Sequence, residues 1–194
     1  GVEVNLSSTV IGIYPEKCIS VNKGDHIENY RAESIIVATG AAERMIPFKG
    51  WDLPGVLGAG AAQTMMNLHG VMPGKKVVMV GTGNVGLVVS FQLLQAGCSV
   101  EALIDAAPRV GGYGVHASKV ARTGVPFLLS HTVVEAKGKD HVESVVIAQV
   151  DEKFRTIPGT EKEIEADTIC IAVGLNPMSQ LVRMTGCEMQ DAGG

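Results

Sequence analysis

The sequence predicts an α/β fold, a doubly wound parallel sheet with a β-meander crossover, and three observations support it. Residues 76–105 have the pattern of a buried strand, a glycine turn, an apolar helix and a second strand. Helix-like and strand-like patterns continue to alternate after that segment. A unit made of a strand, a meander and a closing strand occurs twice, which indicates two related halves.

Residues 1–69 carry strand and turn patterns followed by one helix. Short strands are expected at "VEVNL" (2–6), "STVIGIY" (8–14), "CISVN" (18–22) and 34–39, with a turn at "NKGDH" (22–26). Residues 41–57 are a crossing segment with turn chemistry at Pro47, Gly50, Pro54 and Gly55. A helix of small residues is expected over Ala59–His69, and "VMPGKK" ends it.

The remaining elements follow in order along the chain. "KVVMV" (76–80) predicts a buried strand, and "NVGLVVSFQLLQAG" (84–97) predicts an apolar helix closed by Gly97. "SVEALID" (99–105) is the next strand, a helix is expected around Val115–Arg122, and "VPFLL" (125–129) is a third strand. A meander and the strand in "IEADTICIAVG" (164–174) complete a Rossmann-like order of elements.

The duplication is visible as two pairs of similar phrases. "LSSTV" (6–10) matches "LSHTV" (129–133), and "AESIIVATG" (32–40) matches "ADTICIAVG" (166–174). The second copy is preceded by a glycine turn and its helix. We therefore expect that a corresponding glycine turn once stood upstream of Gly1, so that the chain is one complete nucleotide-binding domain plus the trailing part of another.

The glycine turn itself predicts a dinucleotide site. Gly81, Gly83 and Gly86 have G-x-G-x-x-G spacing between a buried strand and a helix, with Thr82, Asn84 and Val85 between them. The spacing assigns the tight turn to Gly81, close approach of a pyrophosphate to Gly83, and helix packing to Gly86. The free N–H groups of the helix N-terminus would bind the diphosphate.

Asp105 ends the following strand, 19 residues past Gly86, and bears on the choice of dinucleotide. Its carboxylate would accept hydrogen bonds from both hydroxyls of an adenosine ribose and would repel a 2′-phosphate. Ala106 and Ala107 follow it, and Arg109 is the one nearby residue whose charge could bind a phosphate. The pattern favours NAD(H) over NADP(H). A glycine turn that serves only packing is the alternative.

Composition excludes several classes of protein. The net charge of −4, from 16 basic and 20 acidic residues without blocks of one sign, gives no footprint for nucleic acid. No secretory signal is visible. The uncharged stretch between Lys76 and Glu101 is long enough to span a bilayer, but its glycines, asparagine and glutamines favour a buried strand, turn and helix, so no membrane span is expected.

The cysteines and histidines suggest no catalytic or metal site. Four cysteines lack metal spacing and are expected to be small buried hydrophobes in a reducing cytoplasm: Cys18, Cys98, Cys170 and Cys187. Five histidines are scattered and are expected to be surface or helix residues: His26, His69, His116, His131 and His141. His131 follows a strand end where an adenine could lie. Trp51 is expected to anchor the crossing segment.

The segment "ATGAAERMIPFKGWDLPGV" (38–56), with "GAAQ" (60–63) and "VVMVGTGNVG" (77–86), resembles the two-dinucleotide flavoproteins, the pyridine nucleotide-disulfide oxidoreductases in the broad sense. It is most similar to the FAD/NAD-binding subunits of the sarcosine oxidase, opine oxidase and hydrogen cyanide synthase group. The resemblance implies an NAD(P) domain inserted in an FAD domain. It divides the chain into 1–45 (FAD), 46–174 (NAD) and 175–194 (return to FAD).

The resemblance also implies positions for the cofactors. Ala38, Thr39 and Gly40 would lie near FAD, and Ala172, Val173 and Gly174 would close the sheet of the NAD domain. Small residues suit these strand ends because a flat cofactor approaches the backbone only where side chains are short. Leu87, Val88 and Val89 stand where the family often has a glutamate, and no redox cysteine pair lies in this chain, so thioredoxin-reductase-like chemistry is disfavoured.

Three functions remain open at this stage. The first is the NAD(H)-binding portion of an FAD-dependent oxidoreductase that passes hydride between nicotinamide and flavin, with a small amine or amino acid substrate, a partner subunit or a homo-oligomer. The second is a non-catalytic dinucleotide-binding or sensing module, and the third is a flavin-free NAD-dependent dehydrogenase. We expect this chain alone to be inactive, with little FAD binding and weakened NAD(H) binding.

Overall fold

The computed structural model describes residues 1–190, which form two compact units. Unit 1 contains Gly1–Ala42 and the chain from Asn176 onwards, and unit 2 contains Glu43–Leu175. The sequence placed its boundaries at 45/46 and 174/175, within three residues of these divisions. Assignment of the outer pieces to an FAD domain stays a prediction, and positions 191–194 of the segment 175–194 lie outside the described residues.

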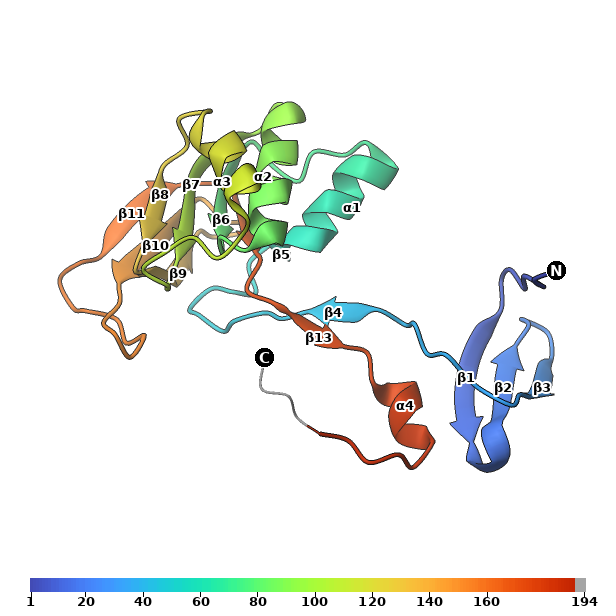
Figure 1. Cartoon of the computed structure of the whole chain (residues 1–194). Coiled ribbons are helices and arrows are strands. Elements are labelled where there is room, and N and C mark those ends of the chain that lie inside the picture. The colour runs from blue at the N-terminus through green and yellow to red at the C-terminus, as the bar shows by residue number, and fades with distance from the viewer. Residues whose placement is uncertain (191–194) are drawn as a thin grey trace. The chain divides into compact units, whose positions relative to one another are not determined.

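Unit 2 is built on a five-stranded parallel sheet in the order β5-β12-β6-β7-β8 (Figure 1). Its strands are β5 (Val56–Gly58), β12 (Thr168–Ile171), β6 (Lys76–Val80), β7 (Ser99–Asp105) and β8 (Phe127–Leu129). Each neighbouring pair is parallel. The predicted α/β class with a parallel sheet is confirmed.

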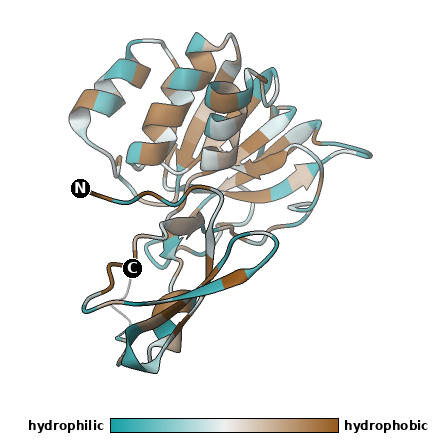
Figure 2. Cartoon of the chain, turned by 90° about the vertical axis from the view of Figure 1, so that its right-hand side faces the viewer, coloured by the Kyte–Doolittle hydropathy of each residue, from teal (hydrophilic) through white to brown (hydrophobic). Residues whose placement is uncertain are grey.

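Three helices cover one face of this sheet: α1 (Ala59–His69), α2 (Asn84–Gln95) and α3 (Gly114–Ala121) (Figure 1). In α2, Leu87, Val89 and Leu93 are fully buried against the strands, and the helices in Figure 2 carry both hydrophobic and hydrophilic segments. The helix ends where Gly97 adopts a left-handed φ of 92°, as its position predicted.

An antiparallel meander covers the other face of the sheet. It contains β9 (His131–Lys137), β10 (Ser144–Gln149) and β11 (Lys162–Glu165), in the order β11-β10-β9. Alternation along β6 serves both layers, because Val77 and Met79 face the helical core while Val78 and Val80 face the meander. The strand is therefore apolar throughout, and unit 2 has three layers.

Unit 1 contains a second antiparallel meander of β1 (Thr9–Tyr14), β2 (Cys18–Asn22) and β3 (Ile27–Arg31), with a 3₁₀ turn at Pro15–Lys17. The short helix α4 (Gln180–Met184) packs against β1. Two strands occur where the chain passes between the units, β4 (Ala41–Glu43) and β13 (Leu175–Pro177), and they pair with each other.

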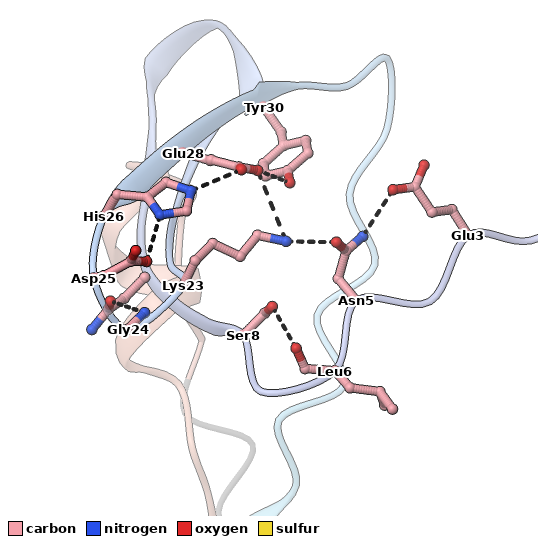
Figure 3. Close-up of polar contacts among 11 residues, drawn as sticks. Glu3, Asn5, Leu6, Ser8, Lys23, Gly24, Asp25, His26, Glu28 and Tyr30 are labelled. Atoms are coloured by element: carbon pink, nitrogen blue, oxygen red, sulfur yellow. Dashed lines mark hydrogen bonds and ion pairs between the residues drawn. The ribbon is translucent and has the colours of Figure 1, made fainter.

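Polar contacts tie the N-terminal segment to the β2–β3 turn (Figure 3). The Lys23 ammonium donates to Asn5 Oδ1 at 2.5 Å and lies 3.8 Å from the Glu28 carboxylate. The two ring nitrogens of His26 lie 2.7 Å from Asp25 Oδ1 and 3.0 Å from Glu28 Oε1. These side chains form a charged cluster on the turn, in which His26 and Asp25 are exposed and Lys23 and Glu28 are half-buried.

The sequence repeat is also a repeat of backbone geometry. We call residues 6–40 the first copy and residues 129–174 the second copy. Ser7 and Ser130, 123 positions apart, have left-handed φ values of 51° and 54°. The following strands each contain a β-bulge whose extra residue is Ile11 in β1 and Val134 in β9, again 123 positions apart.

Two predicted strands are wrong. Residues 2–6 and 34–39 have no strand conformation, and the side chain of Ile36 is 93% exposed. The copy of the second segment, β12, lies between β5 and β6, which supply hydrogen bonds along both edges. Within residues 1–190, no strand pairs with residues 34–39, so their strand propensity is not realised.

Candidate functional site

A cavity of about 710 Å³ opens in unit 2 at the carboxyl ends of the parallel strands. Ligands of α/β sheets bind at this edge. The lining contains most of the residues predicted to bind NAD: Gly81, Gly83, Asn84, Val85, Asp105, Ala172, Val173 and Gly174. The structure therefore brings together segments that are far apart in sequence.

The glycine loop between β6 and α2 is shaped by two close approaches. Gly81 has a left-handed φ of 109°, and a Cβ there would overlap the Ala172 carbonyl oxygen. A Cβ on Gly86 would overlap the Gly81 carbonyl oxygen, so this glycine lets α2 pack against the loop. Neither residue tolerates a side chain, for reasons internal to the fold.

Gly83 differs from these two glycines. It is the N-cap residue of α2 with φ −66° and ψ 175°, which any residue adopts, and a Cβ there would have no atom within 4 Å. No side chain caps the helix at this end. Gly83 thus lines the cavity with bare backbone at the positive end of α2, an arrangement that suits a pyrophosphate.

Asp105 holds the glycine loop in place. Its Oδ2 accepts hydrogen bonds from the Thr82 amide at 2.7 Å and the Thr82 hydroxyl at 2.6 Å, and its Oδ1 accepts from the Ala107 amide at 2.9 Å. A carboxylate has about four acceptor sites, so about one remains on Oδ1. Thr82 itself was predicted to bind NAD, but it is fully buried and is not among the residues that line the cavity.

The end of β12 forms the opposite wall. Ala172 donates its amide to the Val80 carbonyl at 2.7 Å, which aligns the end of β12 with the end of β6. The Gly174 carbonyl accepts from the Arg44 amide at 2.9 Å. Ala172, Val173 and Gly174 line the cavity, and a role for them toward a cofactor stays a prediction.

Glu43 is a cavity residue that the sequence did not reveal. Its carboxylate accepts hydrogen bonds from the amides of Gly60 at 2.6 Å and Ala61 at 3.1 Å, at the N-terminus of α1. It therefore caps that helix from 17 positions upstream and also lines the cavity. The capping pattern that sequence can show requires a residue adjacent to the helix, so Glu43 left no local signal.

His131 also lines the cavity, and the sequence placed it at a strand end where an adenine could lie. Its side chain is 8% exposed, lines the cavity, and places Nδ1 2.7 Å from the Leu129 carbonyl oxygen. The expectation of a surface or helix histidine is wrong here, because residue 131 begins β9 and its side chain is buried.

The three residues predicted to lie near FAD, Ala38, Thr39 and Gly40, all belong to unit 1. The Thr39 hydroxyl donates to the Met178 carbonyl at 2.9 Å, and the Met178 amide donates to the Gly40 carbonyl at 3.0 Å. Ala38 is exposed beside them. The cavity is lined by unit 2 alone, so a flavin position at these three residues stays a prediction.

Two of the four cysteines, Cys98 and Cys170, are buried as expected, whereas the expectation is wrong for Cys187, which is exposed, and Cys18 is half-buried. Burial raises the pKa of Cys170 to about 12 and also raises that of Cys98, so both stay protonated near neutral pH. Within residues 1–190, no group of three or more His, Cys, Asp or Glu side chains is placed to hold a metal ion. Over the same range, no helix is long and apolar enough to cross a bilayer.

The whole chain, residues 1–194, matches the family described as pyridine nucleotide-disulphide oxidoreductase. Hydrogen cyanide synthase subunit HcnB of Pseudomonas aeruginosa is 26% identical over 203 residues, which cover 96% of this chain and 44% of that protein. An opine oxidase subunit of Agrobacterium tumefaciens is 32% identical over 171 residues, covering 81% of this chain and 33% of that protein. The chain thus spans less than half the length of these two relatives.

A solved structure with a similar fold is the thioredoxin reductase of T. acidophilum. The TM-score is 0.73 at 21% sequence identity, over 96% of this chain and 58% of that one. At this identity the likeness concerns the fold, which agrees with the three-layer arrangement of unit 2.

Proposed function

The chain belongs to the pyridine nucleotide-disulphide oxidoreductase family, and from this premise we propose that unit 2 is the NAD(H)-binding portion of an FAD-dependent oxidoreductase. Two of the proteins that the chain resembles are oxidoreductases by name, the opine oxidase subunit and the thioredoxin reductase. The observation that carries the proposal is the contrast among the loop glycines. Packing explains Gly81 and Gly86, whereas Gly83 faces the open cavity and is explained by a ligand that approaches the backbone.

Different residues of the cavity would bind the pyrophosphate, the ribose and the flat ring of the dinucleotide. The N-terminus of α2 and the Gly83 backbone would bind the pyrophosphate. The remaining lone pair on Asp105 Oδ1 would accept one ribose hydroxyl, since Thr82 and Ala107 occupy the other acceptor sites. Ala172, Val173 and Gly174 would leave room for a flat ring at the end of β12.

NAD(H) is favoured over NADP(H) in this arrangement. A 2′-phosphate beside Asp105 would place two like charges close together. Arg109 is exposed and does not line the cavity, so it is not positioned to compensate that repulsion.

A bound nicotinamide supplies or accepts a hydride, which carries two electrons, and the protein contributes binding and orientation. The wall of the cavity is mostly backbone and apolar side chains, which suits ring alignment more than acid–base chemistry. For the full-length protein, we propose FAD near Ala38, Thr39 and Gly40, a small amine or amino acid substrate, and a partner subunit or homo-oligomer. A cytoplasmic location stays a prediction from cysteine usage.

Two alternatives remain. A non-catalytic binding or sensing module would use the same cavity without turnover. A flavin-free NAD-dependent dehydrogenase is less favoured, because the structural repeat of unit 1 has no purpose in such an enzyme. Full-length protein that is purified without a flavin colour and does not respond to NADH would support the module over the oxidoreductase.

Calorimetric titration of this chain with NADH, NADPH and FAD tests the proposal. We expect binding of NADH, weaker binding of NADPH and little binding of FAD. Asp105→Ala should weaken NADH binding by about 1–2 kcal/mol, the scale of lost hydrogen bonds. The matched control is Asp140→Ala, which removes an exposed aspartate of the β9–β10 turn. Tight FAD binding without any response to NADH would overturn the assignment of the loop.

A further inference from the structure

We propose that His131 recognises the adenine of the bound dinucleotide, with Nε2 accepting a hydrogen bond from the 6-amino group. This inference rests on the proposed NAD(H) function of the cavity and assigns a residue that determines its specificity. The evidence is an unpartnered nitrogen, the position of the residue in the sheet, and a comparison with the first copy of the repeat.

The protonation of the ring follows from its one hydrogen bond. Nδ1 lies 2.7 Å from the Leu129 carbonyl oxygen, which can only accept, so Nδ1 carries the hydrogen. In the neutral ring, Nε2 then presents a bare lone pair. This atom is buried and has no partner within the protein, a state that costs free energy unless a donor reaches it.

The position of His131 matches the adenine end of the ligand. Along the sheet order β6-β7-β8, the glycine loop follows β6, Asp105 ends β7, and His131 comes two residues after β8. The segments are joined directly, because Ala107 donates its amide to Asp105 Oδ1 and accepts the Ser130 amide at 3.1 Å. A dinucleotide with pyrophosphate on α2 and ribose at Asp105 therefore places adenine against Ala106, Ala107 and His131, all of which line the cavity.

The first copy shows what the fold requires at this position. Ser8 is the equivalent of His131, and its hydroxyl donates to the Leu6 carbonyl at 2.9 Å (Figure 3). His131 Nδ1 donates to the Leu129 carbonyl in the same way. Both residues follow a serine in the left-handed conformation. A serine is therefore sufficient for the local hydrogen bond, and the imidazole of the second copy adds Nε2, a buried nitrogen without a protein partner in a residue that lines the cavity.

Adenine offers one exocyclic donor, its 6-amino group, and this is the partner that a bare imidazole nitrogen needs. Hypoxanthine has an oxygen at that position. This oxygen and Nε2 would both be acceptors, so no hydrogen bond would form between them. Reduced nicotinamide hypoxanthine dinucleotide is thus a probe that changes the recognised group and leaves the sugars and phosphates intact.

The test compares His131→Ser and His131→Asn with the wild-type chain by calorimetry. Both variants keep a donor for the Leu129 carbonyl, as Ser8 does for Leu6, and both lose Nε2. We expect about tenfold weaker NADH binding, equivalent to about 1.4 kcal/mol. Wild type should bind the hypoxanthine analogue about tenfold more weakly than NADH, and the variants should show no further loss with it. His141→Ser, at an exposed turn residue, is the control.

The outcomes separate this inference from the function on which it rests. Wild type that binds neither NADH nor the analogue overturns the proposed function, before any variant is compared. Wild type that binds NADH normally while both folded variants bind it equally well overturns the role of His131 alone. An equal loss of NADH and of the analogue in His131→Ser would also overturn it, because the 6-amino group would then make no difference.

Discussion

The two copies of the repeat have the same local backbone in different surroundings. Both begin with a left-handed serine, continue with a bulged strand, and form a three-stranded antiparallel meander. The second copy packs its meander on a parallel sheet and ends in the buried strand β12, whereas the equivalent end of the first copy, residues 34–39, is irregular. Val133 is 5% exposed, and Val10, its equivalent, is 38% exposed. Turns and bulges are thus set locally, and burial is set by the packing partner.

The closing segments should show the largest difference in stability. Ile169 is fully buried in β12, and its equivalent Ile35 is half-buried outside any strand. Ile169→Ala should lower the free energy of unfolding by about 3 kcal/mol through lost transfer energy and a cavity, and Ile35→Ala by less than about 1 kcal/mol. Urea denaturation followed by Trp51 fluorescence in unit 2 and by circular dichroism measures both. An equal loss of unfolding free energy in the two variants would show that Ile35 is as buried as Ile169.

The bulged strands offer a matched pair of valines. Val133→Ala should cost about 2 kcal/mol, because the side chain is enclosed between the meander and the sheet. Val10→Ala should cost less than about 0.5 kcal/mol, as for most exposed positions. Thermal denaturation of the two variants against wild type gives the comparison. A larger effect at Val10 would contradict the burial difference on which the comparison depends.

Substitution of the two left-handed serines should change the stability by similar amounts, because the backbone strain at each serine is local. Ser7→Gly and Ser130→Gly each remove the steric cost of a Cβ at positive φ and add chain entropy to the unfolded state. We expect a similar stabilisation of about 0.5 kcal/mol in each copy. Hydrogen exchange resolved by segment can report each copy separately. Opposite signs in the two copies would mean that tertiary packing, and not local geometry, dictates this turn.

The smallest effect concerns pH and the first copy. Hydrogen bonds from the ring to the carboxylates of Glu28 first and Asp25 second raise the pKa of His26 above its ordinary value of 6.5. A raised folded-state pKa adds stability that is present below the unfolded pKa and is lost as pH rises through the folded value. His26→Gln should therefore lower the melting temperature below pH ~6 and leave it unchanged above pH ~8. A loss that is equal at both pH values would exclude protonation as its cause.

Much of unit 2 could be predicted because its signals are local. The strand 76–80, the helix 84–95 and the strand 99–105 lie where apolar runs, Gly97 and the glycine loop indicated. The spacing of the glycine loop predicted the cavity residues Gly81 and Gly83, and the end of the next strand predicted Asp105, for the same reason. Glu43 could not be predicted, since the amides it caps belong to a helix 17 positions away.

The sequence by itself determined the order of elements in residues 76–129, the repeat, and the glycine-loop and β12 segments of the cavity, because propensity and spacing act between near neighbours. Only the tertiary structure decided that "ADTICIAVG" becomes a buried strand and "AESIIVATG" does not, since a parallel strand exists only where other strands supply its hydrogen bonds. It also decided that Asp105 holds Thr82 and that His131 Nε2 lacks a partner. Both depend on side chains that meet across the fold.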